Sequence, residues 1–353
     1  MGALLGLGLT HYPGFAVPDE KMADLFRWTL KDPDMPAGAA APESWPEAAR
    51  LEMGRDGGTA AAAAHRAAVF GHVDRLHDKL RAFNPDVVLI WGDDQYENFT
   101  EDMIPAFCVL AYDDNMRAQP WAHKGGENIW GEDAETAIDV TIDHEFGVEL
   151  ADALLARDID VAYAYRPAHH PDLPHAFINA VLFMDHRREG FGYPVLPFQI
   201  NCYGRRVISY KGSVSRLADA RKATDPRSPS PSRCMQMGAA VADAILASSR
   251  RVAVVASSSW SHAFLVDKTY RRFPDIAADR ELYEAMVAGD WERWRRTTVD
   301  EIEDSGQQEL LNWFALAGAM ERAGAALEWS AFEETHIFNS SKVVAAFHAV
   351  QDD

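Results

Sequence analysis

The chain has 353 residues, of which 48% are hydrophobic and 25% charged, a composition typical of a folded globular protein rather than a disordered or fibrous one. Its 34 basic and 54 acidic residues give a net charge of −20, which repels phosphate backbones and anionic lipid head groups. We therefore expect no nucleic acid and no membrane among its partners. An anionic small molecule is not excluded, because a local pair such as Arg205-Arg206 outweighs distant, screened charge.

The cysteines and the apolar runs exclude further classes of protein. Cys108, Cys202 and Cys234 are too few and too dispersed for a disulfide framework or a cysteine metal cage. No apolar run approaches the ~20 residues that a membrane span needs, and the N-terminus lacks the basic region of a signal peptide. The sequence therefore predicts a cytoplasmic protein with a single domain over residues 1–353. A stretch rich in Pro, Ala and Gly at about 31–57 is interpreted as an insertion, which either covers a pocket or forms a loose connection.

Short apolar runs bounded by turn residues predict buried strands, and apolar residues spaced three or four apart predict helices. The clearest helix covers 60–83, with Thr59 as its N-cap and a buried stripe that includes Val69 and Val73. Alternating strands and helices predict an α/β fold, in which helices flank a central, mostly parallel sheet and the site lies at the carboxyl ends of the strands. Beyond 251–256 the chain is predicted to be helical. The predicted strands are 3–10, 87–90, 107–111, 161–165, 193–201 and 251–256, and the predicted helices are 19–30, 60–83, one around 146–154, 237–246, 281–287 and 302–320.

Polar side chains lie at or shortly after several predicted strand exits, namely His11, Gln95, His175 and His262. Glu309 lies in a predicted helix. Taken singly, each has a structural explanation, since a histidine at a strand end is commonly a hydrogen-bonded core residue and a helical glutamate commonly faces solvent. Parallel strands, however, gather their exits on one edge of a sheet, so we expect these side chains to converge.

At these positions the chain resembles a known family, the class III extradiol ring-cleavage dioxygenases, the group of the protocatechuate 4,5-dioxygenase β subunit. The resemblance covers most of the chain and rests on short motifs in a fixed order. They are His11-Tyr12-Pro13, Gly92-Asp93-Asp94-Gln95-Tyr96-Glu97-Asn98-Phe99, Pro174-His175-Ala176-Phe177, Ser261-His262 and Gly306-Gln307-Gln308-Glu309-Leu310.

The resemblance implies a mononuclear Fe(II) site held by two histidines and one glutamate, with adjacent positions open for a catecholate and O₂. His11 then matches the first ligand and Glu309 the carboxylate. His262 matches the catalytic acid/base, a role that suits a group titrating near neutral pH. His175 matches a second catalytic histidine that touches the ring substituents of the substrate, with His170 as its competitor.

Substrate contacts and partners are also expected on this basis. Asp94, Tyr96 and Arg205 are assigned to substrate binding, the last as a carboxylate anchor, although exposed arginines usually face solvent. The expected partners are a small aromatic substrate and O₂. A homodimer is expected, and a small α-type subunit is a second possibility for the assembly.

The sequence departs from the family pattern in two places. The second metal-binding histidine is replaced by Gln95, whose amide oxygen is a harder and weaker ligand than imidazole. Either Gln95 is a poor third ligand, or Asp94 or water replaces it, or the site is altered or lost, so Mn or Zn competes with Fe(II) as the predicted ion. The family also commonly has two glycines where this chain has Ser258-Ser259, and serine tolerates unusual backbone angles less well.

The leading hypothesis is an extradiol-type dioxygenase that opens a catechol-like or other phenolic ring with O₂ at a mononuclear metal. The alternative is a metal-dependent hydrolase or C–C lyase with a redox-inactive ion, which Gln95 favours. A non-catalytic subunit is disfavoured because His11, His262 and Glu309 are all present. A Ser261-His262 hydrolase is disfavoured most, since adjacent residues cannot easily face each other and there is no Gly-x-Ser-x-Gly elbow.

Overall fold

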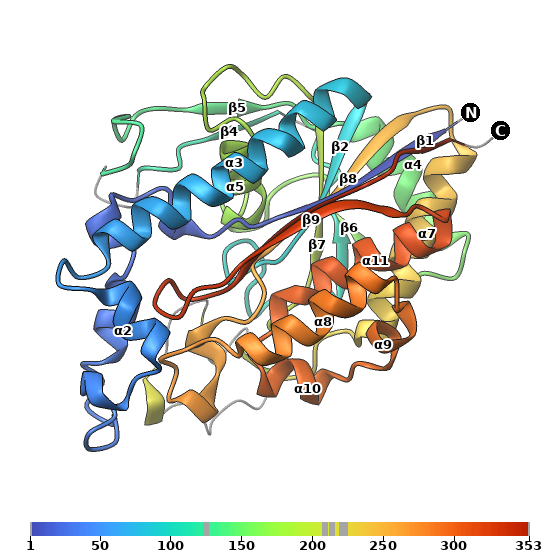
Figure 1. Ribbon diagram of the computed structural model, residues 1–353. Helices are drawn as coiled ribbons and strands as arrows, with labels where there is room; N and C mark the ends of the chain where they lie inside the picture. Colours follow the sequence, from blue (N-terminus) through green and yellow to red (C-terminus); the bar gives the residue numbers. More distant parts are fainter. Residues whose placement is uncertain are drawn as a thin grey trace.

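The computed structural model describes residues 2–113, 115–122, 127–206, 211, 216–218 and 225–351. Within them, nine strands form one mixed sheet in the order β6-β3-β7-β2-β8-β1-β10-β9, with β11 also paired to β1 (Figure 1). The strands are β1 (Ala3–Leu9), β2 (Val87–Gly92), β3 (Phe107–Val109), β6 (Ala162–Tyr163), β7 (Val195–Ile200), β8 (Arg251–Ser257), β9 (Leu327–Glu333), β10 (Lys342–Phe347) and β11 (Val350–Gln351).

The centre of the sheet is parallel. β7, β2, β8 and β1 run in one direction, and each residue of these strands is buried except Arg251 at the start of β8. Strands buried on both faces are typical of parallel sheets covered by helices. Antiparallel strands flank this centre: β10 and β11 pair with β1, β9 pairs with β10, and β3 pairs with β7. The predicted α/β fold with a central, mostly parallel sheet is confirmed.

Helices cover both faces of the sheet and enclose two apolar cores (Figure 1). α3 and α5 contact one face, and α7, α11 and α4 contact the other. A separate two-stranded sheet is formed by β4 (Met116–Ala118) and β5 (Ile138–Val140). The helices are α1 (Asp24–Thr29), α2 (Glu47–Met53), α3 (Thr59–Phe83), α4 (His144–Leu155), α5 (His175–Met184), α7 (Pro231–Ala247), α8 (Ile276–Ala288), α9 (Trp291–Arg296), α10 (Val299–Asp304) and α11 (Leu311–Ala323).

The long helix α3 forms as its apolar spacing predicts, and the predicted stripe, from Val69 to Phe83, is buried. The predicted N-cap is wrong. Gly58, with φ +90°, is the cap residue, and Thr59 is the first helical residue. Asp56 supplies the capping acceptor instead, because its carboxylate receives the backbone N–H of Ala60 at 2.8 Å.

Two predictions for the C-terminal third are wrong. The predicted helix at 302–320 is broken into α10, a short 3₁₀ turn η8 (Gln308–Leu310) and α11. The helix is interrupted around Gly306, whose φ of +70° is a conformation that continues no helix. The remainder of the chain is not all helical, because β9, β10 and β11 complete one side of the sheet. β11 lies beside the start of β1, so the described ends of the chain meet there (Figure 1).

The segment at 31–57 forms a short 3₁₀ turn η3 (Pro42–Ser44) and α2, which lies at the edge of the molecule in Figure 1. Glu52 ties it to the rest of the fold, because its carboxylate accepts the backbone N–H groups of His336 and Ile337. A cavity lies beside His11 and His262, and none of the described residues that line it comes from 31–57. That this segment is an insertion stays a prediction.

The packing of α7 against α11 depends on two glycines. A Cβ at Gly318 would lie 2.0 Å from the carbonyl oxygen of Met235, and one at Gly238 would lie 1.9 Å from that of Ala315. The two backbones therefore touch directly, and a methyl group forces them apart. Since α11 directly follows the turn that carries Glu309, this contact also fixes the height of that turn above the sheet.

We expect Gly318→Ala to lower the free energy of unfolding by about 1–3 kcal/mol, the usual effect of overpacking a close contact. Gly71→Ala is the matched control in the middle of α3, where a Cβ meets nothing within 4 Å. That variant should gain about 0.5–1 kcal/mol through helix propensity. Urea unfolding of the three proteins measures both effects. Equal stability of the two variants would contradict the direct contact of α7 and α11.

Candidate active site

The candidate site lies where the parallel strands end. β1 leads into His11, β2 into Asp93 and Gln95, β7 into Tyr203, and β8 into His262. A cavity of about 590 Å³ opens above these exits. Its chemically active lining residues are His11, Gln95, His175, His262 and Glu309, so the structure brings together all five side chains predicted to act as ligands or catalysts.

His11 lies between two buried carboxylates. Its Nδ1 is 2.8 Å from the backbone oxygen of Ser257, a contact that places the ring proton on Nδ1 in the neutral form. Its Nε2 is 3.4 Å from Glu309 Oε2 and 3.8 Å from Asp93 Oδ1. The Nε2 atom, which is free to bind a proton or a cation, therefore faces two negatively charged groups.

Glu309 lies in η8 and is 1% exposed. Its Oε1 accepts two hydrogen bonds, one from the Tyr203 hydroxyl at 2.5 Å and one from Gln95 Nε2 at 3.1 Å. Its Oε2 has no hydrogen-bond partner among the described residues, although it lies 3.2 Å from His262 Nε2 and 3.4 Å from His11 Nε2. One oxygen of the carboxylate is thus saturated and the other is turned toward the imidazoles.

The pKa values in this cluster follow from burial and opposite charge. Burial lowers the pKa of His11, but Glu309 and then Asp93 outweigh it and raise that pKa to about 9. Burial raises the pKa of Glu309, yet the charges of His262 and His11 hold it below its ordinary value. Burial and the charge of Glu309 raise the pKa of Asp93. The cluster therefore attracts a positive charge to the space beside His11.

His262 differs from His11 in its contacts. Its Nδ1 has no hydrogen-bond partner among the described residues, and burial lowers the pKa of the ring. The ring packs edge-on against Phe264, with centroids 5.5 Å apart. Its backbone N–H donates to the oxygen of Gly306 at 2.8 Å, which ties it to the loop before Glu309. The structure thus keeps a neutral, buried imidazole next to the cavity.

His175 is the first residue of α5, and its ring lies perpendicular to that of His11, with centroids 5.0 Å apart. Its Nδ1 is 2.8 Å from Glu97 Oε2. The competing His170 is not among the described residues that line the cavity, and its Nδ1 lies 2.9 Å from Asp172 Oδ1. Of the two candidates, the geometry therefore places His175 at the site.

The three predicted substrate contacts lie outside the cavity lining that the structure describes. Asp94 closes its own loop, because its carboxylate accepts the backbone N–H groups of residues 97, 98 and 99. The Tyr96 hydroxyl donates to Glu101 at the surface. Arg205 faces Asp300 and Glu303 at 3.5 Å. Local polar contacts engage all three side chains, and their assignment to substrate binding stays a prediction.

Sequence reasoning missed two residues of the site. Asp93 Oδ1 lies 3.8 Å from His11 Nε2, and nothing in the sequence Asp93-Asp94 indicates which of the two carboxylates turns inward. Tyr203, buried beside Glu309, lies shortly after the end of strand β7, and this position after a strand exit is the signal that the sequence offers. Both residues contact His11 or Glu309, and neither is among the described residues that line the cavity.

Ser258 and Ser259, where the family commonly has glycines, have a use in this chain. The hydroxyl of Ser258 donates to the backbone oxygen of Glu309 at 2.9 Å. The hydroxyl of Ser259 lies 2.5 Å from that of Thr10, next to His11. Neither serine has a positive φ, so no glycine is required by the backbone here. The substitution ties the exits of β1 and β8 to the turn that carries Glu309.

The cavity also has an apolar wall. It comes from the segment after β1, from α1, and from the turn after His262. Lys21, whose ammonium pairs with Glu127, contributes a charge to this wall. A flat apolar ring can lie against such a wall while its polar edge faces the histidines. The apolar lining residues are Val17, Met22, Leu25, Trp28 and Phe264.

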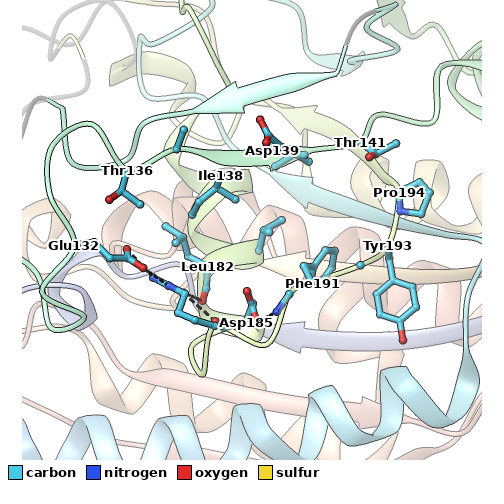
Figure 2. Close-up of a pocket in the computed structure, with 16 residues that line it drawn as sticks. Glu132, Thr136, Ile138, Asp139, Thr141, Leu182, Asp185, Phe191, Tyr193 and Pro194 are labelled. Atoms are coloured by element: carbon cyan, nitrogen blue, oxygen red, sulfur yellow. Dashed lines mark hydrogen bonds and ion pairs between the residues drawn. The ribbon is translucent and has the colours of Figure 1, made fainter.

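A second cavity, of about 500 Å³, lies between β5 and the end of α5 and is shown in Figure 2. Its lining contains no histidine or cysteine in the described part of the chain. Its basic side chain is already engaged, because Arg188 Nε donates to Glu132 at 2.7 Å and Arg188 Nη1 donates to the backbone oxygens of Leu182 and Asp185. The chemistry is therefore concentrated in the first cavity.

One observation indicates that the residues around His11 suit a divalent cation. Asp93 Oδ1 and Glu309 Oε2 are both buried without a hydrogen-bond partner among the described residues, and both approach the same nitrogen, His11 Nε2. Unpaired buried carboxylate oxygens are costly unless a cation compensates them. His11, Asp93 and His175 also each place a ligand atom within 4.8 Å of the other two. Imidazole and carboxylate together suit Fe(II), Mn or Zn.

Comparison with known proteins points to the same chemistry. Residues 224–345 match the family described as the catalytic LigB subunit of aromatic ring-opening dioxygenase. Three similar proteins are each named 2,3-dihydroxyphenylpropionate/2,3-dihydroxicinnamic acid 1,2-dioxygenase. They come from Burkholderia vietnamiensis (26% identical over 227 residues), Paraburkholderia phymatum (28% over 227) and Cupriavidus necator (25% over 229).

Each of these alignments covers 63% of this chain and 56–57% of the relative, so the chain spans about half the length of the curated relatives it matches. The resemblance to class III extradiol dioxygenases, drawn from short motifs, is confirmed. The family match includes His262 and Glu309. In the described part of the chain, no helix combines the length and hydropathy of a membrane span.

Asp279 fixes the two loops that carry His262 and Glu309. Its buried carboxylate accepts the backbone N–H of Ser261 at 2.9 Å and the side-chain N–H of Gln307 at 2.7 Å. Burial raises the pKa of Asp279 from 3.8 to about 7. The folded chain therefore holds this proton in a pH range where the unfolded chain releases it.

Between pH ~4 and ~7 the unfolded state consequently binds fewer protons at this residue, so the free energy of unfolding falls as pH rises, by at most ~1.4 kcal/mol per unit. The Asp279→Asn variant has no ionisable group at this position, so its free energy of unfolding lacks this pH dependence. We expect the stability of the wild type relative to Asp279→Asn to decrease up to about pH 7 and then to level off. Urea unfolding of the metal-free proteins measures it, and a difference independent of pH would contradict the shift.

Proposed function

We propose that this protein is an extradiol-type dioxygenase that opens the ring of a catechol-like compound with O₂ at one divalent metal ion, with Fe(II) as the working ion and Mn or Zn as weaker candidates. The observation that carries the proposal is the pair of buried, unpartnered carboxylate oxygens that face His11 Nε2 in a cavity which also exposes His262. The named relatives, all extradiol dioxygenases, support the same activity.

His11, Asp93 and Glu309 would hold the ion. When bound, Fe(II) supplies open positions for a catecholate and O₂ and passes electron density between them. His262 is the proton carrier in this scheme, because its low pKa keeps it neutral and able to take a phenolic proton. Tyr203 and Gln95 hold Glu309 in place through its Oε1, which leaves Oε2 directed at His11.

The hydrolase or C–C lyase alternative rested on Gln95 alone. The matched family and the names of the relatives do not favour it. The homodimer, the small α-type partner and the cytoplasmic location stay predictions.

The apolar wall suggests which catechols enter the cavity. The names of the relatives describe ring substituents that end in an acid. Among the described residues that line this cavity, the basic side chain is that of Lys21, and its ammonium pairs with Glu127. Leu25 and Trp28 of α1 instead offer apolar surface, with Trp28 64% exposed. We therefore propose a catechol with an uncharged, apolar substituent as the preferred substrate class.

The activity is tested by oxygen consumption with a panel of catechols after anaerobic loading with Fe(II). We expect substrate-dependent O₂ uptake and ring-opened products that carry both oxygen atoms of ¹⁸O₂. His262→Ala should lower kcat by about 10²–10⁴-fold, the usual contribution of a positioned acid/base. Tyr96→Phe is the control, because Tyr96 contacts Glu101 outside the cavity. Ring products without ¹⁸O, or full activity of His262→Ala, would overturn the proposal.

The substrate class is tested with Trp28→Ala. We expect KM for catechols with apolar substituents to rise about 3–10-fold, roughly 1 kcal/mol, since the lost indole surface contacts the substituent. KM for unsubstituted catechol should not change. Leu51→Ala is the control, because Leu51 is 73% exposed and lies outside the described lining. A KM increase of equal size for every catechol would contradict the assignment.

A further inference from the structure

The resemblance assigns Gln95 to the position of the family's second metal-binding histidine, and its contacts show how the side chain is held in this chain. Its side-chain nitrogen lies 3.1 Å from Glu309 Oε1, 3.4 Å from Asp93 Oδ2 and 3.5 Å from His175 Nε2. Rotating the amide by half a turn would bring its oxygen against two carboxylate oxygens, so the hydrogen-bond network fixes the nitrogen in this position. An amide nitrogen has no lone pair to offer a metal. Gln95 is thus a donor that restrains the carboxylates.

An imidazole is nevertheless available at the same place. His175 comes from α5 rather than from the exit of β2, and it offers a ligand atom within 4.8 Å of those of His11 and Asp93. Its Nε2 lies 3.5 Å from the Gln95 amide nitrogen, so the family position and the His175 ring share one side of the site.

The other nitrogen of His175 is held in the way that metal-binding imidazoles are usually held. Glu97 Oε2 is 2.8 Å from His175 Nδ1, and the Glu97 carboxylate also accepts the backbone N–H of His175 at 3.1 Å. A carboxylate at Nδ1 keeps the proton there and leaves the Nε2 lone pair free. His11 has the same arrangement, with the Ser257 oxygen at its Nδ1. His262 does not share it, because its Nδ1 has no partner in the described part of the chain.

We propose that His175 supplies the second imidazole of the metal site, that Asp93 joins Glu309 as a second carboxylate, and that Gln95 is a hydrogen-bond partner of Glu309 rather than a ligand. This assignment rests on the proposed function only in assuming a divalent ion. The charges agree with it, since two carboxylates and two neutral imidazoles make a buried site with a divalent cation electrically neutral. Glu97 is then a positioning residue for His175.

The test uses Mn²⁺ alone as the probe, with the free ion counted by electron paramagnetic resonance during titration of the metal-free full chain. The wild type should bind one Mn²⁺. His175→Ala and His175→Gln should each weaken binding at least 10-fold, and the second variant guards against a folding defect because it preserves side-chain bulk. Gln95→Ala, the matched variant from the same side of the cavity, removes one of the two hydrogen bonds to Glu309 Oε1 and should weaken binding less than either His175 variant does. Glu97→Gln should weaken binding about 10-fold, the usual effect of removing a carboxylate behind a ligand histidine.

The outcomes separate this inference from the proposed function. Wild-type binding that is lost in Gln95→Ala but kept in both His175 variants would overturn the inference and leave the metal-dependent function intact. A wild type that binds no Mn²⁺, Fe(II) or Zn²⁺ would overturn the proposed function, and the inference with it.

Discussion

Asp93 and Glu309 are two buried carboxylates near the same imidazole. Their negative charge in a low-dielectric interior is costly unless neighbouring groups compensate it, and this requirement constrains the side chains around them. His11 lies between them, and the outer oxygens of both groups are turned toward its Nε2. Tyr203 and Gln95 satisfy one oxygen of Glu309 from the other side. Without a positive charge beside His11 this arrangement is unfavourable, and with a divalent ion it becomes a neutral site.

The sheet is what makes the arrangement possible. β1, β8, β2 and β7 are adjacent and parallel, so residues separated by up to 250 positions leave the sheet at the same edge. Direct contacts then join the exits to the turn of Glu309. The Ser258 hydroxyl donates to the backbone oxygen of Glu309, and the backbone N–H of His262 donates to the backbone oxygen of Gly306. Asp279 braces the same two loops from behind. These contacts within the described part of the chain hold the polar side chains of the cavity relative to one another.

Much of this was accessible from the sequence. Apolar runs such as 87–90 and 251–256 predicted the buried strands, and the rule that parallel strands share an exit edge predicted the convergence of His11 and His262. Glu309, in a predicted helix, was added to them by the family resemblance. The edge strands were missed because β9 and β10 contain alanine, glutamate and lysine, which suit a helix equally well, so only sheet pairing decides their conformation.

The remaining misses concern side-chain direction. Asp93 and Asp94 are neighbours with opposite roles, since one lies beneath His11 and the other closes its own loop, and sequence spacing cannot distinguish them. Arg205 and Tyr96 contact nearby acidic residues, and their assignment to substrate binding stays a prediction. Gln95 was recognised as a departure from the family, but the imidazole beside it comes from α5, some 80 residues away, and only the tertiary structure shows it.

The most direct test of the central claim is thermal unfolding of the metal-free protein with and without Fe(II) under anaerobic conditions, combined with iron analysis. An ion bound by His11, Asp93 and Glu309 would stabilise only the folded chain, by about 2.7 kcal/mol at a concentration 100 times its Kd. The account predicts one iron per chain and a clear rise in the unfolding temperature, both lost in Glu309→Ala. An unfolding temperature indifferent to Fe(II), with no iron retained, would contradict it.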